Sequence, residues 1–172
     1  MRQRRLTLVR LTIDQPSANV PDMSEGRPLT QAETNLAASV FGSAVDYSAV
    51  RIHRAKWWLF QPRRVTMAPD GHIWFHPEGG LWCEDFCDRH LGDQGLFIHE
   101  MTHVWQHQKG IFLPLARHPF CRYSYVLKPG WPLHRYGLEQ QGEIVRHAFL
   151  LRQGAKVPGA PPLAQYESIL PF

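Results

Sequence analysis

The sequence predicts an α+β fold with a small, mostly antiparallel sheet and two helices that face each other. Three observations support this prediction. A capped helical segment comes first, short strand-like segments separated by turn residues follow, and two longer segments with helical periodicity lie in the second half of the chain. The 172 residues are enough for one domain with a buried core, and no internal repeat is visible.

The first helix is predicted to begin at Thr30 and to stop at Gly42. Thr30 and Glu33 have the spacing of a capping box, in which each side chain accepts a hydrogen bond from the backbone N–H of the other residue. Apolar residues follow as far as Phe41, and glycine is a common helix terminator.

The strands are expected after this helix. Residues 50–53 are predicted to form a short strand. Residues 64–68 and 72–76 flank Pro69, Asp70 and Gly71, which are typical turn residues, so they are predicted to form a β-hairpin.

The first long helix contains the motif His99-Glu100-Met101-Thr102-His103. Residues four apart lie on one helical face, so His99 and His103 can bind one metal ion, while Glu100 can reach a water molecule beside it. Asp93 is the expected N-cap of this helix, and Gly110 is expected to end it. The pattern is typical of a zinc-dependent peptidase with Glu100 as the general base. An ordinary amphipathic helix with histidines on its polar face is the alternative.

A catalytic zinc ion needs a third protein ligand and an open position. The second long helix, predicted over residues 136–152, offers one. Glu139 is the preferred ligand, and Glu143 is then expected to hold one of the histidines from behind. The reverse order, with Glu143 as the ligand, remains open, as do His134, His147 and the absence of a third ligand. Gly142 is expected to let the two helix backbones approach closely.

These residues resemble a known family. Residues 97–106 and the later segment 139–143 are similar to the gluzincin pattern, in which H-E-x-x-H is followed by E-x-x-x-D. More closely, they resemble a Vgr-related metallopeptidase family associated with contractile injection systems, whose core reads H-E-hydrophobic-T/A-H-x-x-Q. The resemblance implies a zincin-like fold and a role near a phage-tail-like secretion apparatus. It also implies His99, His103 and Glu139 as zinc ligands, one zinc ion per chain, and Glu100 as base. Glu143 departs from the family's usual Asp.

The resemblance divides the chain into three parts. Residues 1–28 are expected to be an N-terminal arm and linker, 29–153 a zincin-like metallopeptidase domain, and 154–172 a proline-rich C-terminal tail. A non-catalytic zincin, used as a binding or assembly module of such a secretion system, is the alternative function.

Residues for substrate binding are also predicted. An oxyanion-stabilising donor is expected from the segment between the two long helices, with Tyr136 as the candidate closest to Glu139 in sequence. Other candidates there are Tyr123, Tyr125, His118 and His134. Ile73, Trp74 and Phe75 are expected to bind an extended peptide by strand addition, although burial of Ile73 and Phe75 in the core is the alternative.

Composition restricts the partners. The net charge is +4, but the basic residues are scattered and no nucleic-acid-binding motif is present, so no nucleic-acid partner is expected. No apolar run reaches the ~20 residues that span a bilayer, and no secretory signal is visible, so no membrane partner is expected. Three cysteines suit a reducing compartment. The expected location is the bacterial cytoplasm, or export through a secretion apparatus, and the expected partner is a peptide or protein substrate.

Two further clusters of residues are candidates for a metal site or a binding surface. Cys83 and Cys87, with nearby acidic residues, could form a second metal site, but their spacing is not a common zinc spacing. Trp57, Trp58 and Phe60 are expected to belong to the core rather than to an exposed patch.

Overall fold

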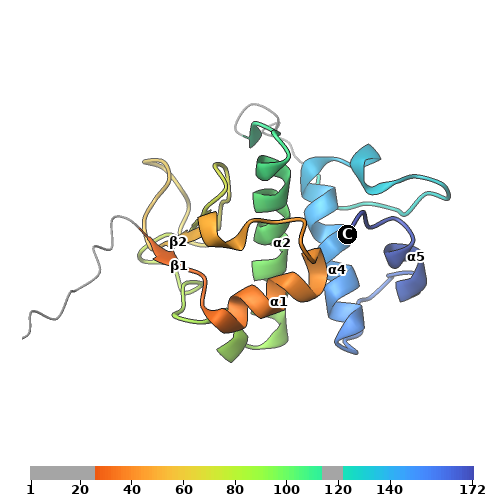
Figure 1. The fold of residues 1–172 in the computed structure, drawn as a ribbon, viewed down its shortest axis with the longest axis horizontal. Coiled ribbons are helices and arrows are strands. Elements are labelled where there is room, and N and C mark those ends of the chain that lie inside the picture. Colours follow the sequence, from red (N-terminus) through yellow and green to blue (C-terminus); the bar gives the residue numbers. More distant parts are fainter. Residues whose placement is uncertain (1–25, 114–121) are drawn as a thin grey trace, which may run out of the picture.

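A computed structural model of the chain describes residues 26–113 and 122–172 (Figure 1). The elements are β1 (Arg27–Pro28), α1 (Gln31–Phe41), β2 (Arg51–His53), β3 (Ile73–Trp74), α2 (Leu91–Gln108), α4 (Leu138–Arg152) and α5 (Leu163–Glu167), with short 3-10 turns between some of them. The predicted α+β class is therefore confirmed. The expected N-terminal arm before residue 26, the candidate His118 and the third cysteine, Cys121, lie outside the described residues.

The sheet is small and mixed. Its order is β1-β2-β3, with β1 antiparallel to β2 and β2 parallel to β3. The predicted hairpin is wrong, because residues 64–68 contribute only one antiparallel bridge, between Met67 and Trp74. The N–H of Val65 donates to the carbonyl of Pro62 across a turn, so this segment bends where a strand would stay extended.

Helix α1 begins as the capping box predicts. Thr30 is the N-cap, and its side chain and that of Glu33 each accept a backbone N–H from the other residue. Glu33 is fully buried; it pairs with Arg27 at 2.7 Å and accepts the N–H of Phe86 at 3.0 Å. One buried carboxylate thus joins α1 to β1 and to the turn that precedes α2.

Helix α2 is the central helix of the molecule, and α1, the sheet and α4 surround it (Figure 1). It begins earlier than predicted, because His90 is the N-cap and accepts the N–H of Asp93 through its ring. Asp93 instead lies in the first turn and pairs with Arg89 at 2.9 Å. Phe97 and Met101 are fully buried, as their spacing predicts.

Helix α4 runs beside α2, as expected for two facing helices (Figure 1). It begins at Leu138, two residues later than predicted, and Gly154 follows its end with a φ of 78°. Helix α5 packs on its other side, within the segment predicted as a tail, and buries Tyr166. The final residue, Phe172, contacts the ring of Phe41 at a centroid distance of 4.8 Å.

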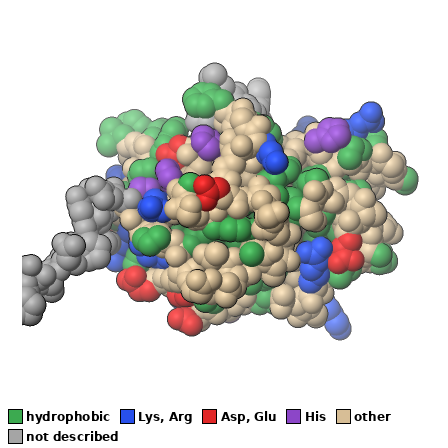
Figure 2. Space-filling view, in the orientation of Figure 1, with side chains coloured by type: hydrophobic (Ala, Val, Ile, Leu, Met, Phe, Trp, Pro, Cys, Tyr) green, Lys and Arg blue, Asp and Glu red, His purple; other side chains and the backbone are tan. Residues whose placement is uncertain are grey.

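The expected burial of the tryptophan-rich segment is wrong. Trp57 and Trp58 are 37% and 45% exposed, and Leu59 and Phe60 are 72% and 73% exposed. Figure 2 shows hydrophobic side chains gathered where the loop between β2 and β3 protrudes, at the upper left.

Within the described part of the chain, no helix is both long enough and apolar enough to cross a bilayer.

Candidate metal centre

Three side chains from α2 and α4 converge on one point. The Nε2 atoms of His99 and His103 lie 3.1 Å apart, and Oε2 of Glu139 lies 3.2 Å and 3.3 Å from them. All three residues are buried, with at most 4% of their surface exposed. Among the described residues, a search for His, Cys, Asp and Glu side chains close enough to share one ion finds this group.

The triangle of donor atoms fits a zinc ion. Zinc binds nitrogen and oxygen at about 2.0–2.1 Å, so tetrahedral geometry places neighbouring ligand atoms about 3.3–3.4 Å apart. The observed separations of 3.1–3.3 Å are close to this spacing. Two histidines and one glutamate also form a ligand set that catalytic zinc sites use, with the fourth position left open.

His103 is oriented by a chain of glutamines. Its Nδ1 lies 2.8 Å from Oε1 of Gln106, and since an amide oxygen only accepts, the ring proton sits on Nδ1. Gln106 donates in turn to Oε1 of Gln141 at 2.9 Å, and Gln141 donates to the carbonyl of Tyr136 at 2.7 Å. This chain turns the lone pair of Nε2 toward Glu139.

The sequence reasoning missed the role of both glutamines. Gln106 follows His103 by three residues, the spacing at which side chains on a helix meet, and this signal could have identified it. Gln141 lies on the other helix, and nothing local in the sequence indicates its pairing with Gln106.

His99 is held from behind by Glu143, in the position expected for a supporting residue. Its Nδ1 lies 2.9 Å from Oε1 of Glu143, an ion-pair distance, although the N–H does not point directly at the oxygen. Gly142 makes room for the ring: a Cβ there would lie 2.7 Å from Cε1 of His99. The glycine thus admits an imidazole, whereas the sequence suggested contact between two helix backbones.

The charges around His99 and Glu143 favour a protonated His99 when no metal is bound. Burial alone would lower the pKa of His99, but its contacts with the carboxylates of Glu139 and Glu143 outweigh burial and raise the pKa to about 9. Burial would raise the pKa of Glu143, yet the contact with His99 lowers it. A bound cation would therefore replace a proton that the site already attracts.

Glu100 lies in the same turn of α2 as His99. It is 4% exposed, and its buried Oε2 has no hydrogen-bond partner among the described residues. A buried carboxylate oxygen without a partner is costly, and such an atom calls for an explanation. A water molecule held beside the three ligands would supply the missing hydrogen bond.

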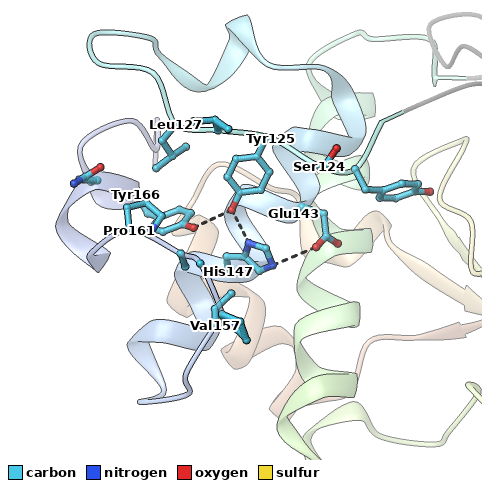
Figure 3. Close-up of a pocket in the computed structure, with 14 residues that line it drawn as sticks. Ser124, Tyr125, Leu127, Glu143, His147, Val157, Pro161 and Tyr166 are labelled. Carbon is cyan, nitrogen blue, oxygen red and sulfur yellow. Dashed lines mark hydrogen bonds and ion pairs between the residues drawn. The ribbon is translucent and has the colours of Figure 1, made fainter.

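A second network leads away from Glu143 into a cavity of about 540 Å³ (Figure 3). Oε2 of Glu143 lies 3.4 Å from Nε2 of His147, and Nδ1 of His147 lies 2.5 Å from the hydroxyl of Tyr125. The hydroxyl of Tyr166 lies 3.0 Å from the hydroxyl of Tyr125. Burial lowers the pKa of His147, so its neutral form is favoured. Tyr123 also lines the cavity, and its ring lies 6.1 Å from that of His99.

The predicted oxyanion donor and the predicted substrate-binding strand make structural contacts of their own. The buried hydroxyl of Tyr136 accepts the N–H of Lys128 at 2.8 Å, so the structure gives its role as an oxyanion donor no support. Ile73 and Phe75 are at most 1% exposed, which matches the alternative that they belong to the core. Both backbone groups of Trp74 bond to Met67, which leaves them unavailable to an added strand. The assignments of these residues remain predictions.

The two described cysteines do not form a second metal site. Both thiols are free, and burial raises the pKa of Cys83 to about 11 and that of Cys87 to about 12. Among the described residues, neither cysteine belongs to a group of His, Cys, Asp and Glu side chains close enough to share an ion.

Comparison with known proteins, by sequence and by structure, finds similarity to one protein of Pseudomonas aeruginosa. The type VI secretion system spike protein VgrG2b is 45% identical over 139 residues, which cover 76% of this chain but only 13% of the spike protein. The solved structure of the effector domain of VgrG2b superposes with a TM-score of 0.72 at 41% identity, covering 86% of this chain and 83% of that domain. No protein-family model matches the chain.

Proposed function

The chain belongs to the family of the VgrG2b effector domain, and from this premise we propose that it is a secretion-associated, zinc-dependent peptidase. Its relation to a type VI secretion system component supports the association with secretion. One observation carries the proposed activity: the buried triangle of His99, His103 and Glu139 lies beside Glu100, a carboxylate whose buried Oε2 has no hydrogen-bond partner in the part of the chain that the structure describes.

The proposed ligands are His99, His103 and Glu139, with one zinc ion per chain. When bound, zinc supplies a Lewis acid that polarises the substrate carbonyl and makes water more acidic. Gln106 holds the ring proton of His103 on Nδ1, and the contact with Glu143 restrains the ring of His99, so the Nε2 atoms of both rings would be the ones to hold the ion.

Glu100 performs the proton transfers in this mechanism. Its Oε2 accepts a proton from the water that attacks the peptide carbonyl, and the same carboxyl then delivers the proton to the departing amine. Burial keeps bulk water away from this carboxylate and strengthens its electrostatic interactions. The ring of Tyr123 lies 6.1 Å from that of His99, and we assign to this tyrosine the contact with the developing oxyanion.

The substrate of this proposed peptidase is a peptide or protein. The peptidase itself would reach its substrate by export through a secretion apparatus. The chain covers only 13% of the spike protein that it resembles, so activity and partners of the whole spike protein are carried over only as part of this proposal.

A non-catalytic zinc module is the second candidate. A structural zinc site is normally closed by four protein ligands, whereas the described residues bring only three together. The proposed peptidase therefore accounts better for Glu100, since a structural site does not need a general base.

Hydrolysis of a peptide library by the zinc-loaded protein tests the activity. Glu100→Gln should lower turnover by about 10²–10⁴-fold, because the amide cannot accept the proton, while zinc content stays the same. Asp93→Asn is the matched control: it changes a carboxylate on the same helix that pairs with Arg89 and His90, just before the helix begins. Unchanged turnover in Glu100→Gln would refute the assigned base, and zinc binding without hydrolysis in the native protein would favour the zinc module.

A further inference from the structure

The loop between β2 and β3 presents large apolar side chains to solvent. Trp57, Trp58, Leu59 and Phe60 are consecutive, and their exposed fractions rise along the sequence from 37% to 73%. Val65 adds another exposed apolar side chain at 41%. Contiguous exposed apolar surface of this kind usually marks an interaction site.

The loop is held in this shape by buried contacts at its base. Gln61 is only 4% exposed; its side chain accepts the N–H of Trp57 and donates to the carbonyls of Val65 and Trp74. Trp58 and Phe60 also contact each other edge to face, with ring centroids 5.8 Å apart. The apolar residues are therefore exposed by a defined backbone conformation, and a partner need not order the loop on binding.

Basic residues surround the apolar tip. From Tyr47 to Pro69 the sequence has no Asp or Glu, and its cationic side chains are Arg51, Arg54, Lys56, Arg63 and Arg64. Arg63 forms an exposed ion pair with Glu78 at 2.6 Å, and Arg54 lies over the ring of Trp82. Lys56 and Arg64 are exposed on the two sides of the tip.

We infer that this loop docks the protein on a membrane surface that contains anionic lipids. Tryptophan is favoured at the boundary between lipid headgroups and acyl chains, and leucine and phenylalanine partition deeper. Lysine and arginine beside them are attracted to anionic headgroups. A protruding tip fits a deformable lipid surface better than a preformed protein pocket, and the loop segment 47–69, which has five cationic side chains and no acidic one, complements the negative membrane. The inference departs from the expectation that no membrane partner exists, and it does not depend on the proposed peptidase activity.

Binding of the full chain to lipid vesicles tests this inference, with co-sedimentation and tryptophan emission as readouts. Vesicles of phosphatidylcholine with about one quarter phosphatidylglycerol should bind at least about tenfold more tightly than phosphatidylcholine alone. Salt should weaken this binding, because it screens the charges. The emission should shift to shorter wavelength as Trp57 and Trp58 leave water.

Two variants and one control make the test specific. The triple variant W58S/L59S/F60S should lower partitioning by at least about 100-fold, and K56E/R64E should remove the preference for anionic vesicles. Phe112→Ser is the control, because Phe112 is 59% exposed on a different segment, and it should bind like the native protein. An unchanged circular dichroism spectrum confirms folding of each variant.

Three outcomes would overturn the inference. These are absence of binding to anionic vesicles, binding that the triple variant retains, and binding that Phe112→Ser loses equally. Self-association of the native protein that W58S/L59S/F60S abolishes, without vesicle binding, would assign the loop to a protein interface instead.

Discussion

His99 is the most closely constrained side chain of the candidate centre. Its Nε2 faces Glu139 and His103, its Nδ1 faces Glu143, and one side of its ring lies against Gly142. Both ring nitrogens and one side of the ring are therefore in contact with named atoms. A small change in the space around it should alter metal binding more than it alters the fold.

Gly142→Ala tests this constraint. The added Cβ would lie 2.7 Å from Cε1 of His99, closer than real contacts allow, so the ring must shift. We expect zinc affinity to fall by about 10–100-fold, the usual effect of disturbing the support of a ligand. The stability of helix α4 should not fall for reasons of helix propensity, since alanine favours a helix by about 1 kcal/mol over glycine.

A competition assay with a zinc-sensitive dye measures the affinity of each variant. Gly80→Ala is the control, because a Cβ at that position meets nothing within 4 Å and should leave the affinity unchanged. If Gly142→Ala bound zinc as tightly as the native protein, the glycine would not be needed to place His99.

The pair of helices α2 and α4 forms the candidate metal centre as one unit. Helix α2 carries His99 and His103, whereas α4 carries Glu139 and also Glu143, which contacts the ring of His99. Gln106 of α2 bonds His103 within its own helix and also bonds Gln141 and the carbonyl of Leu138 on α4. Packing of the helices and orientation of the imidazole therefore depend on the same side chain.

Gln106→Leu should reduce zinc affinity by about 10–100-fold, because His103 loses the acceptor that fixes its tautomer. It should also lower the free energy of unfolding by about 1–3 kcal/mol, since Gln141 is left with an unpaired buried oxygen. Gln108→Leu is a matched control on the same helix. Gln108 bonds only the backbone of the exposed Asp46, so its loss should leave zinc affinity unchanged.

Zinc titration and urea denaturation of both variants separate the two effects. Equal zinc affinity in the Gln106 and Gln108 variants would show that the glutamine chain does not orient His103.

The sequence predicts the elements whose signals are local. The i, i+4 spacing of His99 and His103 and the capping box of Thr30 and Glu33 each depend on a few neighbouring residues, and the structure shows both. Glu139 could be selected as a ligand because a second periodic helix contained few carboxylates.

Features that depend on distant partners could not be predicted in this way. The parallel pairing of β2 and β3 depends on a connection that local turn residues do not encode, so a hairpin was predicted instead. The burial of Glu33 depends on Arg27 and on the N–H of Phe86, 53 positions away. Trp57 to Phe60 were expected in the core because apolar character alone does not distinguish a core from an exposed loop.

The stability of the whole molecule should depend on pH through His99 when zinc is absent. The pKa of this histidine is raised from an ordinary value of 6.5 to about 9. A raised pKa means that the stabilising contribution is fully present below about pH 6.5 and is lost as the pH rises through about 9. The metal-free protein should therefore lose about 2–4 kcal/mol of unfolding free energy over this interval.

Urea denaturation of the metal-free protein at several pH values between about 6 and 10 measures this loss. His99→Gln is the control, because it removes the titrating group and should flatten the profile. A native profile that is flat or rises over this range would contradict the protonated pair. Zinc affinity should change in the opposite direction and increase with pH, because the metal displaces the proton.

The central claim is that α2 and α4 together build a zinc centre, and the zinc content of the purified protein tests it most directly. Elemental mass spectrometry of the native chain beside His103→Ala should find about one zinc ion per chain in the native protein and almost none in the variant, because two remaining ligands bind weakly. A native protein without zinc, even after zinc is supplied and the excess removed, would contradict the claim and reduce the motif to a buried hydrogen-bonded cluster.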